Sequence, residues 1–113
     1  SESTLKKHSW VIKLYQAFSE RSGIVPFPLD ARHAAWFIRM IGLEADYAVG
    51  SIEDVIIPSL KRIHREMTGM DTSAEINASL AQALKDIKKA LLNDAMQLEK
   101  SRQSLTTSKG SLV

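Results

Sequence analysis

Apolar side chains recur at steps of three and four residues between Ser51 and Gly69. This spacing predicts one buried stripe on an amphipathic helix. The stripe consists of Ile52, Val55, Ile56, Leu60, Ile63 and Met67. Ser51 is expected to cap the start of the helix, and Gly69 to end it. Because Pro58 removes a backbone hydrogen bond, we expect a kink or an irregular first turn there.

The same spacing predicts a first helix over Thr4–Glu20. Its main stripe is Trp10, Leu14, Ala17 and Phe18, and Val11 and Tyr15 widen it. Gly23 should end this helix. The prolines of the following segment, Ile24–Leu29, forbid regular helix, so we expect an extended linker. Its apolar side chains, Ile24, Val25 and Phe27, should contact the core.

Two further helices complete the pattern. Asp30 should cap a helix that runs to about Gly42 and buries Ala34, Ala35, Phe37, Ile38 and Ile41. Asp71–Ser73 should cap a long last helix. Its apolar positions are Ile76, Leu80, Ala83, Leu84, Ile87, Leu91, Ala95 and Leu98. If its partners are shorter, the end of this helix should overhang and offer an apolar stripe to another domain or subunit.

No segment alternates as a strand does, so the sequence predicts an all-α fold, a compact bundle of four helices. Residues 1–100 should form one helical domain, and residues 101–113 a polar tail or the start of an interdomain linker. One core should unite six apolar side chains of the first three helices. They are Trp10, Phe18, Phe37, Ile56, Leu60 and Ile63.

Composition narrows the function classes. The chain has 113 residues, a formal net charge of +2 and no cysteine. Disulfides, thiolate metal sites and cysteine nucleophiles are therefore excluded. No apolar run approaches the roughly 20 residues that span a bilayer, so we expect no membrane partner. We expect an intracellular location, in the cytoplasm or nucleoid or in the nucleus.

Basic residues gather at two places despite the low net charge. Lys61, Arg62, His64 and Arg65 fill the second half of the Ser51–Gly69 helix, and Lys85, Lys88 and Lys89 lie on the last helix. Cations near a helix C-terminus suit the helix dipole, so a solvated helix end explains the first cluster. Taken alone, the cluster favours this explanation, and a surface that neutralises phosphates is the alternative that the rest of the chain supports.

No catalytic constellation is evident, and we expect the chain to be no enzyme and to bind no metal or cofactor. The three histidines, His8, His33 and His64, fall on different elements without the spacing of a metal site. No serine lies in a nucleophile elbow, and no glycine-rich phosphate loop is present. Glu53 and Asp54 are adjacent in sequence, so their side chains diverge on a helix.

An ordered set of residues resembles the N-terminal core-binding domain of tyrosine recombinases, the phage integrase family. The first half of the set is Thr4, Phe18, Gly23, Pro28 and Ala35-Trp36-Phe37. The second half is Tyr47, Ser51-Ile52, Leu60, His64-Arg65, Gly69 and the stretch from Ala83 to Lys89. The resemblance covers about residues 4–92. It implies an orthogonal four-helix, SAM-like domain that clamps one face of duplex DNA while a separate C-terminal catalytic domain cuts it.

The resemblance also implies which residues contact DNA. They are Thr4, Lys6, Lys7 and Lys13 on the first helix, Ser51, Lys61, Arg62 and Arg65 on the third, and Lys85, Lys88 and Lys89 on the last. We expect the cations of the first and third helices to converge on one face. Glu53, Asp54 and Pro58 depart from the family pattern, which usually has cationic or amide side chains near this helix start. Tyr15 and Tyr47 are expected to be structural.

A second interpretation stays open. The same fold could serve as a helical protein-interaction module that binds no DNA. The low net charge and the acidic start of the third helix favour this alternative. In either case the apolar stripe of the last helix could serve self-association.

Overall fold

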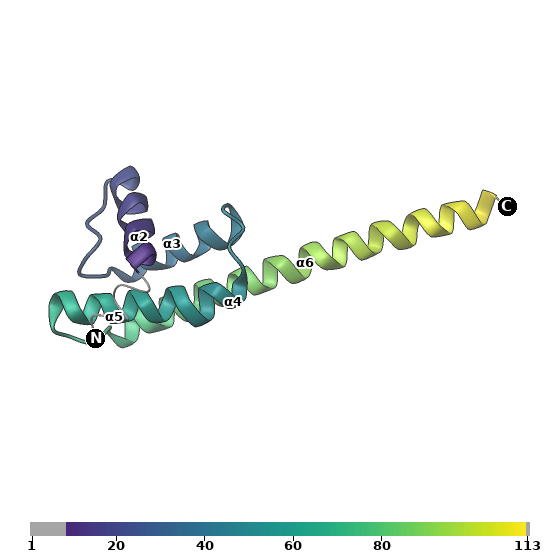
Figure 1. Cartoon of the computed structure of the whole chain (residues 1–113). Helices are drawn as coiled ribbons and strands as arrows, with labels where there is room; N and C mark the ends of the chain where they lie inside the picture. The colour runs from purple at the N-terminus through teal and green to yellow at the C-terminus, as the bar shows by residue number, and fades with distance from the viewer. Residues whose placement is uncertain (1–8, 113) are drawn as a thin grey trace.

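The computed structural model describes the backbone of residues 9–112 and the side chains of residues 9–101. Within that range the chain is all-helical and has no strand (Figure 1). The elements are α2 (Ser9–Ser22), α3 (Ala31–Leu43), α4 (Val49–Ser51), the π-helical turn η1 (Ile52–Ile56), α5 (Ile57–Thr68) and α6 (Ala74–Leu112). Because α4, η1 and α5 follow one another without a break, they form one continuous helix, and the described residues contain four helices in all. The predicted all-α bundle of four helices is confirmed.

The helices form a compact body from which α6 projects. In Figure 1, α2 crosses the direction of α5 and α6, and the second half of α6 extends far beyond the other helices. The molecule accordingly measures 68 × 27 × 25 Å along its principal axes. α3 packs along the first half of α6, and α2 packs on α5.

The core is centred on an aromatic cluster between α2 and α3. Phe37 lies 4.9 Å from Tyr15 and 5.3 Å from Phe18, measured between ring centroids. Such tilted and edge-to-face pairs add to the free energy gained by burial. Apolar side chains from every helix join the cluster, including Val11, Ile38, Ile41, Ile52, Ile56, Leu60, Leu80, Ala83 and Ile87.

The predicted stripe of α2 is displaced by one position. Val11, Tyr15 and Phe18 are buried, whereas Trp10 and Ala17 are exposed. The prediction that Trp10 shares the core is therefore wrong. Its indole instead stacks on the Tyr47 ring at 6.5 Å, at the edge of the core. Tyr47 thereby anchors the connection between α3 and α4, as expected.

The ends of the predicted segments are partly confirmed. Asp30 caps α3, because its Oδ1 accepts hydrogen bonds from the backbone N–H groups of Arg32 and His33 at 2.9 and 3.1 Å. In the linker before it, Leu29 is buried but Val25 is exposed, so the prediction for Val25 is wrong. Met67 was expected in the buried stripe of α5, yet it lies exposed in the last turn.

The start of the third helix differs from the prediction. The helix begins at Val49, so Ser51 lies inside it and makes no capping hydrogen bond. The irregularity expected near Pro58 takes the form of the π-helical turn η1, in which the Ile57 N–H donates to the Ile52 carbonyl. Pro58 is the second residue of α5, which follows η1 directly, so the irregular turn lies just before the residue that lacks a backbone N–H.

Close packing joins α3 to α6. Gly42 is buried, and a methyl group added there would overlap the side chain of Ile87. Beyond Ile87 the apolar positions Leu91, Ala95 and Leu98 are all exposed, so the predicted overhang is confirmed. The backbone stays helical through Leu112, whereas the sequence analysis expects helix to end near Ser101. The division of the chain at that point into domain and tail stays a prediction.

Candidate nucleic-acid interface

The orientation of α5 sets three cations on the surface. Ile56, Leu60 and Ile63 turn their shared face into the protein. At 100° per residue the opposite face then carries Lys61, Arg62 and Arg65. These three side chains line a shallow hollow with Asp71, Thr72 and Asn77, which come from the start of α6 and the segment before it. We call this hollow the basic groove.

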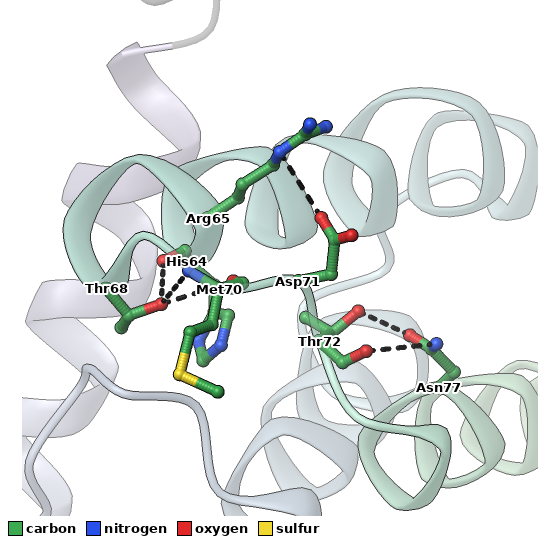
Figure 2. Close-up of polar contacts among 7 residues, drawn as sticks. All are labelled: His64, Arg65, Thr68, Met70, Asp71, Thr72 and Asn77. Atoms are coloured by element: carbon green, nitrogen blue, oxygen red, sulfur yellow. Dashed lines mark hydrogen bonds and ion pairs between the residues drawn. The ribbon is translucent and has the colours of Figure 1, made fainter.

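The connection between α5 and α6 fixes the wall of the groove. Gly69 adopts a left-handed conformation with φ of 73° and ends α5, as predicted. The Thr68 hydroxyl donates to the His64 carbonyl at 2.8 Å, and the Met70 N–H lies 3.2 Å from the same hydroxyl oxygen. Figure 2 shows how this turn brings Asp71 back toward α5.

Polar contacts occupy the far side of the groove. Arg65 Nε lies 3.3 Å from Asp71 Oδ1. The Thr72 hydroxyl donates to Asn77 Oδ1 at 2.6 Å, and Asn77 Nδ2 lies 3.5 Å from the Thr72 carbonyl (Figure 2). By contrast, Lys61 and Arg62 form no ion pair with any residue in the range 9–101.

His64 is buried, unlike the cations that flank it in the sequence. Its position in the sequence places it in the basic cluster, but its side chain is buried and faces the linker. Its Nδ1 accepts a hydrogen bond from the Leu29 N–H at 3.1 Å, which ties residues 24–29 to α5. His64 is therefore a structural residue, and a buried backbone donor would be left unpaired without it.

The other predicted DNA contacts are spread over the surface. Lys13 is exposed on α2, directly opposite the buried face of that helix. Ser51 is exposed on α4, and Lys85 and Lys89 are exposed on α6. The remaining candidates, Thr4, Lys6 and Lys7, lie outside the described residues. The convergence of the first-helix and third-helix cations on one face thus stays a prediction.

One long-range ion pair engages a predicted DNA-contacting cation and one of the two acidic residues at the start of the third helix. Lys88 Nζ lies 3.3 Å from Glu53 Oε2, so Glu53 of η1 is directed toward α6. Asp54 is exposed and has no ion pair among residues 9–101. Of the two acidic residues that depart from the family pattern, only Asp54 presents an unpaired charge.

The tyrosines of this part of the chain are placed as structural residues. Tyr15 is fully buried, and burial raises the pKa of its phenol to about 12. The neighbouring Ser19 hydroxyl acts in the opposite direction on this pKa, although the two hydroxyls do not meet the geometry of a hydrogen bond. A buried phenol with a raised pKa is poorly suited to attack a phosphodiester.

The described residues show neither a metal-binding cluster nor a membrane-spanning helix. Residues 9–101 contain no group of three or more histidine, aspartate or glutamate side chains that could hold a metal ion. In the same part of the chain no helix is both long and apolar enough to cross a membrane.

Sequence reasoning found the cations of the groove but missed its opposite wall. Asp71 and Thr72 were assigned only a capping role, and Asn77 none. The signal available was the left-handed turn at Gly69, because such a turn reverses the chain and returns the next residues to the helix they have left.

Comparison with known protein families, with curated protein sequences and with solved structures finds no match.

Proposed function

We propose that this chain is a DNA-binding clamp domain with a SAM-like fold, of the kind that precedes the catalytic domain in tyrosine recombinases. The proposal rests on the ordered resemblance over residues 4–92 and on one structural observation. That observation is the basic groove, in which the cations of α5 share one exposed surface with hydrogen-bonding groups of α6. Its partners would be duplex DNA and a C-terminal catalytic domain.

The arrangement of the groove fits a phosphate backbone. Arginine and lysine side chains supply most of the affinity for DNA by neutralising phosphates, and such contacts position a protein without reading sequence. Lys61 and Arg62 are available for this role because they form no ion pair among residues 9–101. Lys13, Lys85 and Lys89 add exposed cations on α2 and α6. Lys88 contributes less, because Glu53 already balances its charge.

A salt series with labelled duplex DNA tests the proposal. Each phosphate contact should add about 0.9 to the slope of log K against log salt. The double variant Lys61→Ala/Arg62→Ala should bind more weakly and lower that slope by roughly 0.9 for each lost contact. Arg21→Ala is a suitable control, because Arg21 is exposed at the end of α2 and does not line the groove. Identical, salt-insensitive curves for all three proteins would exclude the proposal.

The alternative function is a helical protein-interaction module. The observation that favours it is the apolar surface of the projecting part of α6, where Leu91, Leu92, Met96 and Leu98 are all exposed. Exposed apolar patches of this kind mark interaction sites. Sedimentation of the whole chain over a concentration series would detect self-association. A Leu91→Ser/Leu98→Ser variant should abolish any association that uses this surface.

A further inference from the structure

The basic groove contains a single carboxylate. Of its six lining residues, Lys61, Arg62 and Arg65 are cations, Thr72 and Asn77 are neutral, and Asp71 is the one anion. The Asp71 carboxylate is held by Arg65, at 3.3 Å from its Nε. A negatively charged group therefore already pairs with one of the three cations of the groove.

The remaining donors differ in how readily they can take a ligand. Thr72 and Asn77 hydrogen-bond to each other, which satisfies the Thr72 hydroxyl and one donor of the amide (Figure 2). Arg65 forms an ion pair with Asp71, so its charge is already partly balanced. Only Lys61 and Arg62 face the groove without an ion-pair partner in residues 9–101.

We propose that Asp71 acts as an internal competitor for phosphate: a DNA phosphate entering the groove takes Arg65 from Asp71. This inference rests on the proposed function and adds its regulation. Both side chains of the pair are largely exposed, 71% for Arg65 and 79% for Asp71. Exposed ion pairs contribute little free energy, so the exchange is cheap. A phosphate offers arginine a planar, two-point contact that replaces the carboxylate.

Competition has a specific consequence for mutants of the pair. Asp71→Asn removes the competing charge while keeping the shape of the side chain. It should tighten binding to duplex DNA by about twofold at 0.1 M salt, the effect of one like charge about 6 Å from a phosphate in water, screened over a Debye length of about 10 Å. Glu66→Gln makes the same change of net charge at an exposed residue next to Arg65 that does not line the groove. It should change the affinity less than Asp71→Asn does.

A double-mutant cycle separates competition from general repulsion. If Asp71 acts through Arg65, the gain from Asp71→Asn should largely disappear in an Arg65→Ala background. An equal gain in both backgrounds, or an equal gain from Glu66→Gln, would show that Asp71 acts only as one more negative charge. Either of those results overturns the proposed competition and leaves DNA binding itself intact.

An NMR titration tests the exchange without DNA. The Nε–H resonance of Arg65 should shift in a saturable manner as inorganic pyrophosphate is added, and should do so at lower concentrations in Asp71→Asn. An unmoved Arg65 resonance would contradict the inference even if DNA binds. A saturable shift in a protein that binds no duplex DNA would instead support phosphate exchange and exclude the clamp function.

Discussion

The two halves of α6 have the same sequence pattern and opposite environments. In the first half, Ile76, Leu80, Ala83 and Ile87 are at most 8% exposed. In the second half, Leu91 is 44% exposed and Leu98 is 57% exposed, although both continue the same spacing. An amphipathic period thus predicts which face of a helix is apolar, but it does not predict whether another element covers that face.

The length of the partner helix explains the difference. α3 has 13 residues and α6 has 39, so they are about 20 and 58 Å long at 1.5 Å per residue. α3 runs beside α6 until Gly42 meets Ile87, and then the chain turns away at Leu43. Glu53 of η1 still pairs with Lys88 just past that point, but in the part of the chain that the structure describes no helix lies beside the projecting end of α6 (Figure 1).

We expect the largest effect from a matched pair of leucine-to-alanine substitutions, one in each half of α6. Leu80→Ala should cost about 2–5 kcal/mol of unfolding free energy, because it empties a fully buried site. Leu98→Ala should change the unfolding free energy by less than about 0.5 kcal/mol, as surface substitutions usually do. Urea denaturation of both variants measures the difference. Equal losses would mean that the second half of α6 is also covered in solution.

The close approach of α3 and α6 predicts the next largest effect. Gly42→Ala should destabilise the protein by about 1–3 kcal/mol, because the added methyl group overlaps Ile87. Gly50→Ala is the control, since a methyl group there meets no atom within 4 Å. The control should be neutral or stabilising by up to about 1 kcal/mol, since alanine favours helix over glycine. Thermal unfolding of both variants distinguishes packing from propensity.

A polar contact at the same interface predicts a smaller, pH-dependent effect. Asp86 accepts hydrogen bonds from Gln82 and Arg39, at 2.9 and 3.0 Å, and these contacts lower the pKa of its carboxyl group. A lowered pKa in the folded state means that the carboxylate stabilises the fold above its ordinary pKa, and that this contribution is lost as pH falls. Asp86→Ala should therefore lower the melting temperature at pH 7.

The acid limit supplies the check on that prediction. The difference between Asp86→Ala and the unaltered chain should vanish as the pH falls through the titration of Asp86, because protonation removes from the unaltered chain the charged contacts that the variant already lacks. Asp94→Ala is the control in the exposed half of α6, where Asp94 forms no ion pair with residues 9–101. It should leave the melting temperature unchanged at both pH values. A difference for Asp86→Ala that persists in acid would point to lost packing.

Hydrogen exchange should sharpen the comparison with no mutation at all. Amides that open only when the core opens exchange slowly, whereas amides of uncovered helix exchange through local fraying. We expect strong protection around Leu80 and Ile87 and weak protection from Asn93 to Ser101. Uniform protection along the whole of this stretch would indicate a partner on the exposed face.

Local sequence signals predicted most of the fold. Asp30 and Gly69 mark helix ends by their own chemistry, and both are confirmed. The register of α2 was less certain, because Trp10 and Val11 are both apolar and either could face inward. In the structure Val11 faces inward and Ser19 is buried beside Tyr15. A serine at a core position gives no hydrophobic signal, so the sequence pattern did not reveal this register. The prediction that Met67 is buried was wrong because the last turn of a helix can extend beyond the elements that cover the rest of it.

The candidate site was predictable only in part, because contacts between distant residues leave no local signal in the sequence. The cations of α5 lie within five residues of one another, so the cluster is visible in the sequence. Lys61 and Arg62 do line the same groove. The charges that balance some of them come from distant positions, as with Glu53 and Lys88, which are 35 residues apart. Nothing in the local pattern announces such a pair, since it depends on how η1 lies against α6.

The π-helical turn also bears on the register of the third helix. A π turn holds one more residue than an α turn between the same two hydrogen-bonded ends, so it is geometrically equivalent to one extra residue in a regular α-helix. The five isoleucine and valine positions around η1 could absorb such an extra residue because neighbouring apolar residues can substitute for one another in the core. Deleting one residue from Glu53 to Val55 and replacing Pro58 by alanine should then give a regular α-helix from Val49 to Thr68.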